Sequence, residues 1–127
     1  MQDFHKIDIW KRSYALTTEI YQLTSTFPSE EKYGLASQIR RAASSIPINI
    51  AEGAGRCSRK EFAHFILIAM GSASELDCEL LLAHDLGFIS DENFYKIYNE
   101  LVEIRKMMTA YRSSLINYDE NLSKRCE

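Results

Sequence analysis

The sequence predicts an all-α protein, an up-down-up-down bundle of four helices. Apolar residues recur every three or four positions, only two prolines and five glycines occur in 127 residues, and three short breaks divide the pattern into four segments. A hydrophobic fraction of 46% and a charged fraction of 26% are typical of one globular domain. We expect the bundle over residues 1–118 and a polar C-terminal tail over residues 119–127.

The first predicted helix is amphipathic and ends at residues 27–29 (Phe-Pro-Ser). Proline disfavours the helical conformation in the residue before it, which places the end at Phe27. Either Asp3 or Asp8 can cap its start. Two adjacent stripes with helical spacing, one apolar and one aromatic, consist of Ile9, Leu16, Ile20, Leu23 and Phe27 and of Trp10, Tyr14 and Tyr21.

The second predicted helix begins at residues 29–31 (Ser-Glu-Glu), which supply a cap and acidic residues in the first turn. Pro47 lies inside its apolar pattern and removes a hydrogen bond to the carbonyl of Ala43, so we expect a kink. The polar residues that follow either satisfy backbone groups freed by the proline or hold the next loop. Two glycines close the helix, because glycine takes the left-handed conformation at a C-cap. The residues interpreted as structural are Pro47, Asn49, Glu52, Gly53 and Gly55.

Capping signals also delimit the third and fourth predicted helices. Ser58 and Glu61 form an S-x-x-E capping box, and Gly87 stops the third helix after about Leu86. Residues 90–92 (Ser-Asp-Glu) cap the fourth helix. Its apolar residues alternate by three and four positions, at Phe94, Ile97, Leu101, Ile104, Met108, Tyr111 and Leu115.

The third predicted helix is apolar on more faces than one bundle core uses. A single stripe that includes Phe65, Ala69 and Leu76 is enough for the core. A helix that is hydrophobic on several faces has to be buried on several faces, so we expect the protein to self-associate. The predicted oligomer interface consists of Ile66, Leu67, Ile68, Met70, Leu81 and Leu82.

Two motifs, residues 38–43 (QIRRAA) and 49–53 (NIAEG), resemble the bacterial four helix bundle protein family. Members of this family are often encoded within intervening sequences of large-subunit ribosomal RNA genes, and the likeness covers nearly the whole chain. The resemblance implies a bundle that assembles into a closed ring, a homopentamer in known relatives, with no assigned activity. The chain is also distantly similar to the accessory variability protein of diversity-generating retroelements, which binds RNA and a reverse transcriptase.

No catalytic residue, metal site or cofactor is predicted. Glu61 and His64 have the E-x-x-H spacing of di-iron bundles, but no second such pair is present and the capping box already uses Glu61. Residues 53–55 lack the G-K-[ST] ending of a phosphate loop, and no G-x-S-x-G elbow occurs. Cys57 lies beside Arg56, which can activate a thiol, but a lone cysteine in a tight turn is more often inert.

Neither a membrane span nor a secretory signal is predicted. The longest apolar run, residues 65–70, is far shorter than the roughly 20 residues that a membrane helix needs, and residues 1–6 contain no apolar core. The three cysteines include no C-x-x-C pair, which is typical of free thiols in a reducing compartment. We therefore expect a cytoplasmic protein.

Positive charge is concentrated in residues 35–60 of a chain whose net charge is −3. Arginine matches phosphate geometry and stacks on bases, so RNA is the predicted ligand. For the two mid-helix arginines, a structural pairing with Glu75, Asp77 or Glu79 is the favoured alternative; for the other three cations, phosphate contact and plain solvation are equally open. The predicted nucleic-acid-binding residues are Arg40, Arg41, Arg56, Arg59 and Lys60.

These observations predict a non-enzymatic, homo-oligomeric bundle that binds RNA through basic loop residues. A ring would multiply a few weak phosphate contacts per subunit. The alternative is a protein–protein interaction scaffold, with an unidentified protein partner, in which the arginines only join subunits. An enzyme is the least favoured interpretation.

Overall fold

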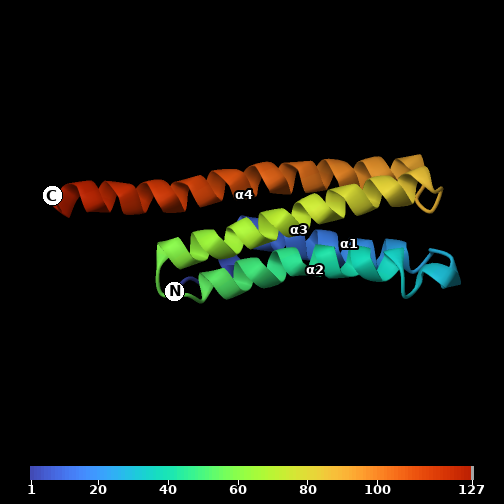
Figure 1. Ribbon diagram of the computed structural model, residues 1–127, viewed down its shortest axis with the longest axis horizontal. Helices are drawn as coiled ribbons and strands as arrows, with labels where there is room; N and C mark the ends of the chain where they lie inside the picture. Colours follow the sequence, from blue (N-terminus) through green and yellow to red (C-terminus); the bar gives the residue numbers. More distant parts are fainter. Residues whose placement is uncertain (127) are drawn as a thin grey trace.

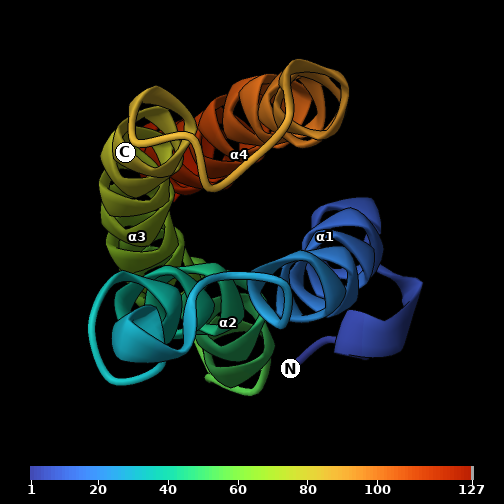
Figure 2. The same ribbon diagram turned by 90° about the vertical axis from the view of Figure 1, so that its right-hand side faces the viewer.

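Four antiparallel helices form the structure, a computed structural model that describes the backbone of residues 1–126 and the side chains of residues 1–118. Viewed end-on, they surround a common axis in chain order (Figures 1 and 2). No strand occurs in residues 1–126, so the all-α, four-helix prediction is confirmed. The elements are η1 (Phe4–Lys6), α1 (Asp8–Thr24), η2 (Ser29–Glu31), α2 (Leu35–Ala54), α3 (Arg59–Asp85) and α4 (Asp91–Cys126).

The start of α1 separates the two candidate caps. Asp3 caps the short 3₁₀ helix η1, because its carboxylate accepts a hydrogen bond from the backbone N–H of His5 at 3.1 Å. Asp8 is instead the first residue of α1, where a carboxylate interacts favourably with the positive end of the helix dipole. The residue before it, Ile7, provides no side-chain cap.

The second helix begins later than the sequence predicts. Residues 29–31 form only the 3₁₀ turn η2, and α2 starts at Leu35 rather than at Ser29. The interruption lies at Gly34, whose ψ of −116° is outside the helical range. Glu31 still acts as a cap, since its Oε2 accepts a hydrogen bond from the backbone N–H of Leu35 at 3.1 Å.

The other helix ends follow the predicted signals, with two exceptions. Helix α1 ends at Thr24 rather than at Phe27, because residues 25–27 already form a turn before Pro28. Ser58 Oγ accepts from the N–H of Glu61 at 3.1 Å, and Ser90 Oγ accepts from the N–H of Asn93 at 3.2 Å, so both caps are confirmed. Gly87 follows α3 with a φ of +81°. Gly55, in contrast, has a φ of −80° at the end of α2, so the left-handed C-cap predicted there is wrong.

Pro47 lies within α2, which continues through it without interruption. Pro47 has no N–H, so the carbonyl of Ala43 lacks its usual partner within the helix. The hydroxyl of Thr17 on α1 lies 3.1 Å from this carbonyl and donates to it. The same hydroxyl lies 2.8 Å from the carbonyl of Ser13, so its single proton is shared between two acceptors. Asn49 is one of the two polar residues predicted either for this role or for holding the next loop, and its amide instead donates to Ser45 O and Oγ at 2.7 and 2.9 Å.

The core is one continuous cluster contributed by all four helices. The apolar stripe predicted for the fourth helix is buried except for Tyr111, which is half-buried. Ile66 is fully buried in this core, and Met70 packs against it. Including Ile66 among the surface interface residues was therefore wrong, because its helix face points inward. The four other residues of that set are exposed, namely Leu67, Ile68, Leu81 and Leu82.

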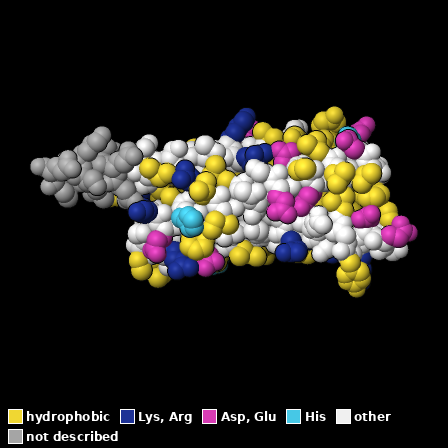
Figure 3. Space-filling model, viewed as in Figure 1, with side chains coloured by type: hydrophobic (Ala, Val, Ile, Leu, Met, Phe, Trp, Pro, Cys, Tyr) yellow, Lys and Arg dark blue, Asp and Glu magenta, His cyan; other side chains and the backbone are white. Residues whose placement is uncertain are grey.

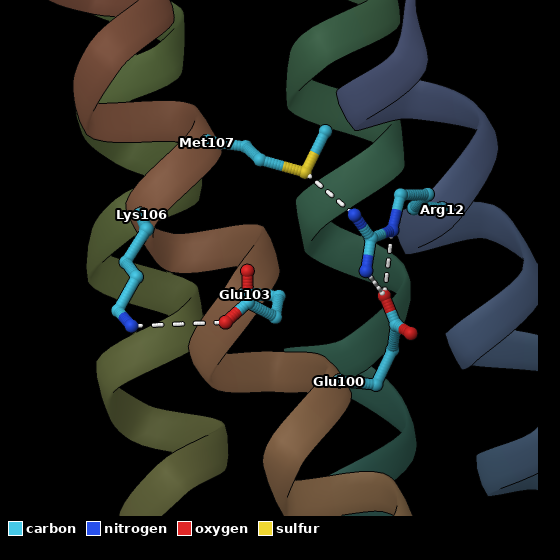
Figure 4. Close-up of polar contacts among 5 residues, drawn as sticks. All are labelled: Arg12, Glu100, Glu103, Lys106 and Met107. Atoms are coloured by element: carbon cyan, nitrogen blue, oxygen red, sulfur yellow. Dashed lines mark hydrogen bonds and ion pairs between the residues drawn. The ribbon is translucent and has the colours of Figure 1, made fainter.

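Helices α1 and α4 are joined by a polar link (Figure 4). Arg12 of α1 donates from Nε to Glu100 Oε1 at 2.7 Å and from Nη1 to the sulfur of Met107 at 3.0 Å. Within α4, Lys106 and Glu103 form a longer ion pair of 3.7 Å. Arg12 thus links the first and last helices through a carboxylate and a thioether, beside the apolar core that they share.

The predicted polar tail, residues 119–127, coincides with the last turns of α4, whose backbone is helical to Cys126. The side chains of these residues, and residue 127 as a whole, lie outside the described part of the chain. The division between bundle and tail therefore stays a prediction. None of the described helices is both long enough and apolar enough to cross a membrane.

Candidate nucleic-acid interface

Three of the five predicted cations lie together where α2 turns into α3. We call Arg56, Arg59 and Lys60 the basic turn. Figure 3 shows Lys and Arg side chains beside Asp and Glu side chains at this end of the molecule. The capping box of Ser58 and Glu61 fixes the first turn of α3 and thereby the direction in which this segment leaves α2.

Each arginine of the basic turn lies against an aromatic ring. Arg59 Cζ is 3.7 Å from the ring centroid of Tyr118 on α4, and Arg56 Cζ is 4.9 Å from that of Phe65 on α3. A guanidinium that stacks on a ring uses its face and keeps its N–H groups, which point outward in its plane, for other acceptors. Stacking therefore orders both arginines and leaves them able to donate to an anion.

Among the described residues, Glu52 is the carboxylate that forms an ion pair with the basic turn. Arg56 Nη2 lies 3.0 Å from Glu52 Oε1, one turn earlier on α2, in an exposed ion pair. Such surface pairs are worth about 0–1 kcal/mol and exchange readily for a phosphate. Within the described residues, neither Arg59 nor Lys60 forms an ion pair. Glu52, predicted to satisfy the backbone or hold the loop, thus contacts the loop through Arg56.

Gly53 sets how closely α2 and α3 meet at the basic turn. A Cβ atom placed on Gly53 would lie 2.7 Å from Phe65 Cβ and 2.9 Å from Phe62 Cδ1. These distances are shorter than real contacts allow, so only glycine permits this approach. Gly53 therefore has a packing function that differs from the helix-ending one predicted from the sequence.

The N-terminal segment lies against the same end of the bundle. The N–H of Gln2 donates to the carbonyl of Ala54 at 2.8 Å, and Tyr111 Oη donates to Gln2 Oε1 at 3.0 Å. A hollow of about 280 Å³ is lined by Gln2 together with Arg56 and Arg59. Residues near the start of the chain thus border the basic turn.

Arg40 and Arg41 do not belong to this cluster. They precede Arg56 by about 20 Å along the helix axis. Arg40 is half-buried against α1, donating to Thr24 Oγ1 at 2.7 Å and to Tyr21 O at 3.0 Å. Arg40 therefore contacts the C-terminal end of α1, where the helix dipole favours a cation. It joins α2 to α1, as a structural pairing predicts, but its partners are not the acidic residues proposed from the sequence. Arg41 is exposed and lines a polar hollow with Ser45, Ser72 and Glu75, among others.

The acidic partners considered for these arginines are engaged differently. Asp77 accepts from Arg105 Nη1 at 2.6 Å. Glu79 is 8% exposed, and its Oε2 has no hydrogen-bond partner among the described residues. Burial, helped by a hydrogen bond to Glu75 and the charge of Glu75, raises the pKa of Glu79 to about 7. This carboxyl is therefore about half ionised near pH 7 and largely neutral at lower pH.

The motifs considered for other chemistry have ordinary surroundings. Glu61 serves the capping box, with its Oε2 3.3 Å from Ser58 Oγ, and His64 is exposed beside the ring of Phe65. Among the described residues, no group of three or more His, Cys, Asp or Glu side chains is placed to hold a metal ion. Cys57 is an exposed free thiol.

Two residues of the candidate interface were not predicted from the sequence. Phe65 was assigned to the core alone, and Tyr118 was not singled out, yet both carry a stacked arginine. Tyr118 could have been found from the antiparallel pairing of α3 and α4. Counting equal numbers of residues away from the α3–α4 turn in both directions places residue 118 beside Arg59. Using this signal requires knowing which helices are neighbours.

Comparisons with known proteins identify the family of this chain. The family model described as "23S rRNA-intervening sequence protein" matches residues 5–110. Among solved structures, the chain is similar to a protein of unknown function from the S23 ribosomal protein family of Bacteroides thetaiotaomicron, with 27% identity and a TM-score of 0.77. That match covers 83% of this chain and 95% of the other. No curated protein matches significantly, and neither description names an enzymatic activity.

A family match over most of the sequence agrees with the four-helix fold and with the solved relative, so the chain belongs to the 23S rRNA-intervening sequence protein family.

Proposed function

We propose that the protein is a non-enzymatic RNA-binding module that contacts phosphates through the basic turn. The observation that carries this proposal is the pair of arginines stacked on Phe65 and Tyr118, with Lys60 beside them. Stacking restricts the guanidinium groups before a ligand arrives, so less side-chain entropy is lost on binding. The family's link to a 23S rRNA intervening sequence makes RNA the nucleic acid to test first.

Self-association forms the second part of the proposal. Leu67, Ile68, Leu81 and Leu82 on the outer face of α3 are 41–49% exposed. Figure 3 shows hydrophobic side chains gathered on the visible surface near the α3–α4 turn. Covering this face with further copies of the chain would remove apolar area from water, at about 25 cal/mol per Å². The resemblance to ring-forming relatives favours a homopentamer, and three cysteines without a C-x-x-C pair favour a reducing compartment such as the cytoplasm.

A ring would give the basic turn enough contacts to retain RNA. One subunit offers three cations, one of them shared with Glu52, and surface contacts of this kind are individually weak. Several subunits that engage one RNA strand raise its local concentration at the remaining sites, so avidity exceeds single-site affinity.

Neutralising the basic turn is expected to weaken RNA binding and to reduce its salt dependence. In the variant Arg56→Gln/Arg59→Gln/Lys60→Gln, the slope of log K against log salt should fall by up to about 0.7 for each lost contact on a single strand. The measurement is a titration of labelled RNA at two salt concentrations. A variant with the same charge change elsewhere, Lys32→Gln/Lys96→Gln/Lys106→Gln, serves as the control and should bind nearly as the original protein does.

The alternative, a protein–protein scaffold without nucleic-acid binding, rests on the same exposed face of α3. Equal RNA binding by the basic-turn variant and the original protein, or binding by neither at physiological salt, would favour it. In that case the arginines would serve only to join subunits.

A charge on the outer face of α3 is expected to dissociate the oligomer without unfolding the subunit. Light scattering coupled to size exclusion should give a multimeric mass for the original protein, five subunits if the resemblance holds. The substitution Ile68→Glu should give a monomer with unchanged helical circular dichroism, because Ile68 is 41% exposed in the single chain. Tyr33→Glu, which alters a residue that is 89% exposed before α2, should keep the multimeric mass.

A monomeric mass for the unaltered protein at micromolar concentration would contradict self-association. A multimeric mass for both the Ile68→Glu and the Leu67→Glu variants would also contradict self-association through this face.

A further inference from the structure

A short ladder of aromatic rings follows the N-terminal segment onto the outside of α1. We define the aromatic ladder as Phe4, His5, Trp10 and Tyr14. The rings of Phe4 and His5 are stacked with centroids 4.1 Å apart, and those of Trp10 and Tyr14 are stacked at 4.9 Å. Phe4 and Trp10 meet edge to face at 4.9 Å, which joins the two pairs.

The two ends of the ladder are open to solvent. The His5 side chain is 67% exposed and Tyr14 is 53% exposed, whereas Phe4 and Trp10 are half-buried against the core. The His5 ring is held in place, because Asp3 Oδ1 lies 2.7 Å from its Nδ1 and also accepts from its backbone N–H. The inner rings thus anchor the ladder, and the outer rings present aromatic surface that the fold does not use.

The ladder begins at the same end of the bundle as the basic turn. The hydrogen bond from Gln2 to Ala54 brings the start of the chain to the end of α2, and Gln2 lines the same hollow as Arg56 and Arg59. Lys6 and Lys11, both exposed, flank the rings. Residues 1–14 carry Lys6, Lys11 and Arg12 against Asp3 and Asp8, and Arg12 is paired with Glu100, so the exposed cations of this segment are Lys6 and Lys11.

We propose that the aromatic ladder is a stacking platform for unpaired RNA bases, whose phosphates run onto the basic turn. Aromatic rings beside a positive surface bind single strands with little sequence preference, because every base has a flat π-face. A duplex hides these faces within its own stack and can use only the phosphate contacts. The inference extends the RNA binding proposed above and adds a preference for single strands over duplexes.

Trp10 makes this inference directly measurable, since it is the only tryptophan of the chain. Titration with a 12-nucleotide uridine strand should quench Trp10 emission, whereas a 12-base-pair RNA duplex and an abasic strand of equal length should leave it nearly unchanged. Tyr14→Ala and His5→Ala should each weaken binding of the uridine strand about tenfold and leave binding of the duplex unchanged. Tyr33→Ala, which removes an exposed tyrosine from another site, is the matched control.

The outcomes separate the ladder from the basic turn. If the uridine strand binds through the basic turn but neither quenches Trp10 nor responds to the two alanine variants, the ladder proposal fails and the proposed function stands. Quenching by the abasic strand, or equal losses for single strand and duplex in the alanine variants, would also overturn it. Binding of no RNA at low salt would overturn both proposals.

Discussion

Gly53→Ala is expected to lower the free energy of unfolding by about 2 kcal/mol, although alanine is the better helix former. The added methyl group would lie 2.7 Å from Phe65 Cβ, an atom close to the backbone that cannot rotate away. Helices α2 and α3 would have to separate, which would also move the ring on which Arg56 stacks. Urea unfolding followed by circular dichroism at fixed protein concentration measures the change.

Gly55→Ala provides the matched control two residues further along. A Cβ there would meet Glu52 O at 3.4 Å, an ordinary contact, and the φ of −80° suits alanine. Its stability should change by no more than about 0.5 kcal/mol. If both variants were equally stable, the close approach at Gly53 would not constrain the bundle.

Glu79→Gln is expected to stabilise the protein by about 2 kcal/mol at pH 8 and to have little effect at pH 4. The pKa of Glu79 is about 7 in the folded protein, against 4.5 as its ordinary value, chiefly because burial penalises the charged form. Between pH 4.5 and pH 7, Glu79 keeps its proton in the folded state and has released it in the unfolded state. The free energy of unfolding therefore falls as pH rises from about 4.5 to about 7, and the penalty is fully present above pH 7.

Urea unfolding at the two pH values checks this prediction. Glutamine keeps the size and polarity of the side chain but carries no charge, so it removes the penalty that appears at high pH. Glu19→Gln, at an exposed position on α1, should change stability little at either pH. A stabilisation by Glu79→Gln of the same size at pH 4 and pH 8 would show that ionisation of Glu79 is not its source.

Most of the fold could be predicted from the sequence, because helix periodicity and caps are local signals. The capping box at Ser58 and the stop at Gly87 are correct for this reason. The start of α2 was misplaced because residues 29–31 have the composition of a helix start, whereas the backbone at Gly34 breaks the helix. Ile66 was misassigned because the width of the apolar stripe on α3 does not reveal which edge faces the core.

Less of the candidate site could be predicted, because its contacts join distant segments. Counting charges located the basic turn, but it could not show that Arg40 is held by Thr24 while Arg59 stacks on Tyr118. These partners depend on which helices are neighbours and on how they are aligned along the bundle axis. The aromatic stripe of α1 was visible in the sequence, whereas its extension to Phe4 and His5 required the path of the N-terminal segment.

The hydrogen bond from Thr17 to Ala43 couples the formation of α2 to the docking of α1. In isolation, α2 would be divided at Pro47 into two segments too short to be stable helices in water, where about 12–15 residues are marginal. When α1 docks, the Thr17 hydroxyl reaches the carbonyl of Ala43, which Pro47 leaves without its usual N–H partner. An unbroken α2 therefore depends on contact with α1. When α1 undocks, the backbone of α2 around Pro47 should therefore lose protection, so its amides there should exchange with solvent through opening of α1.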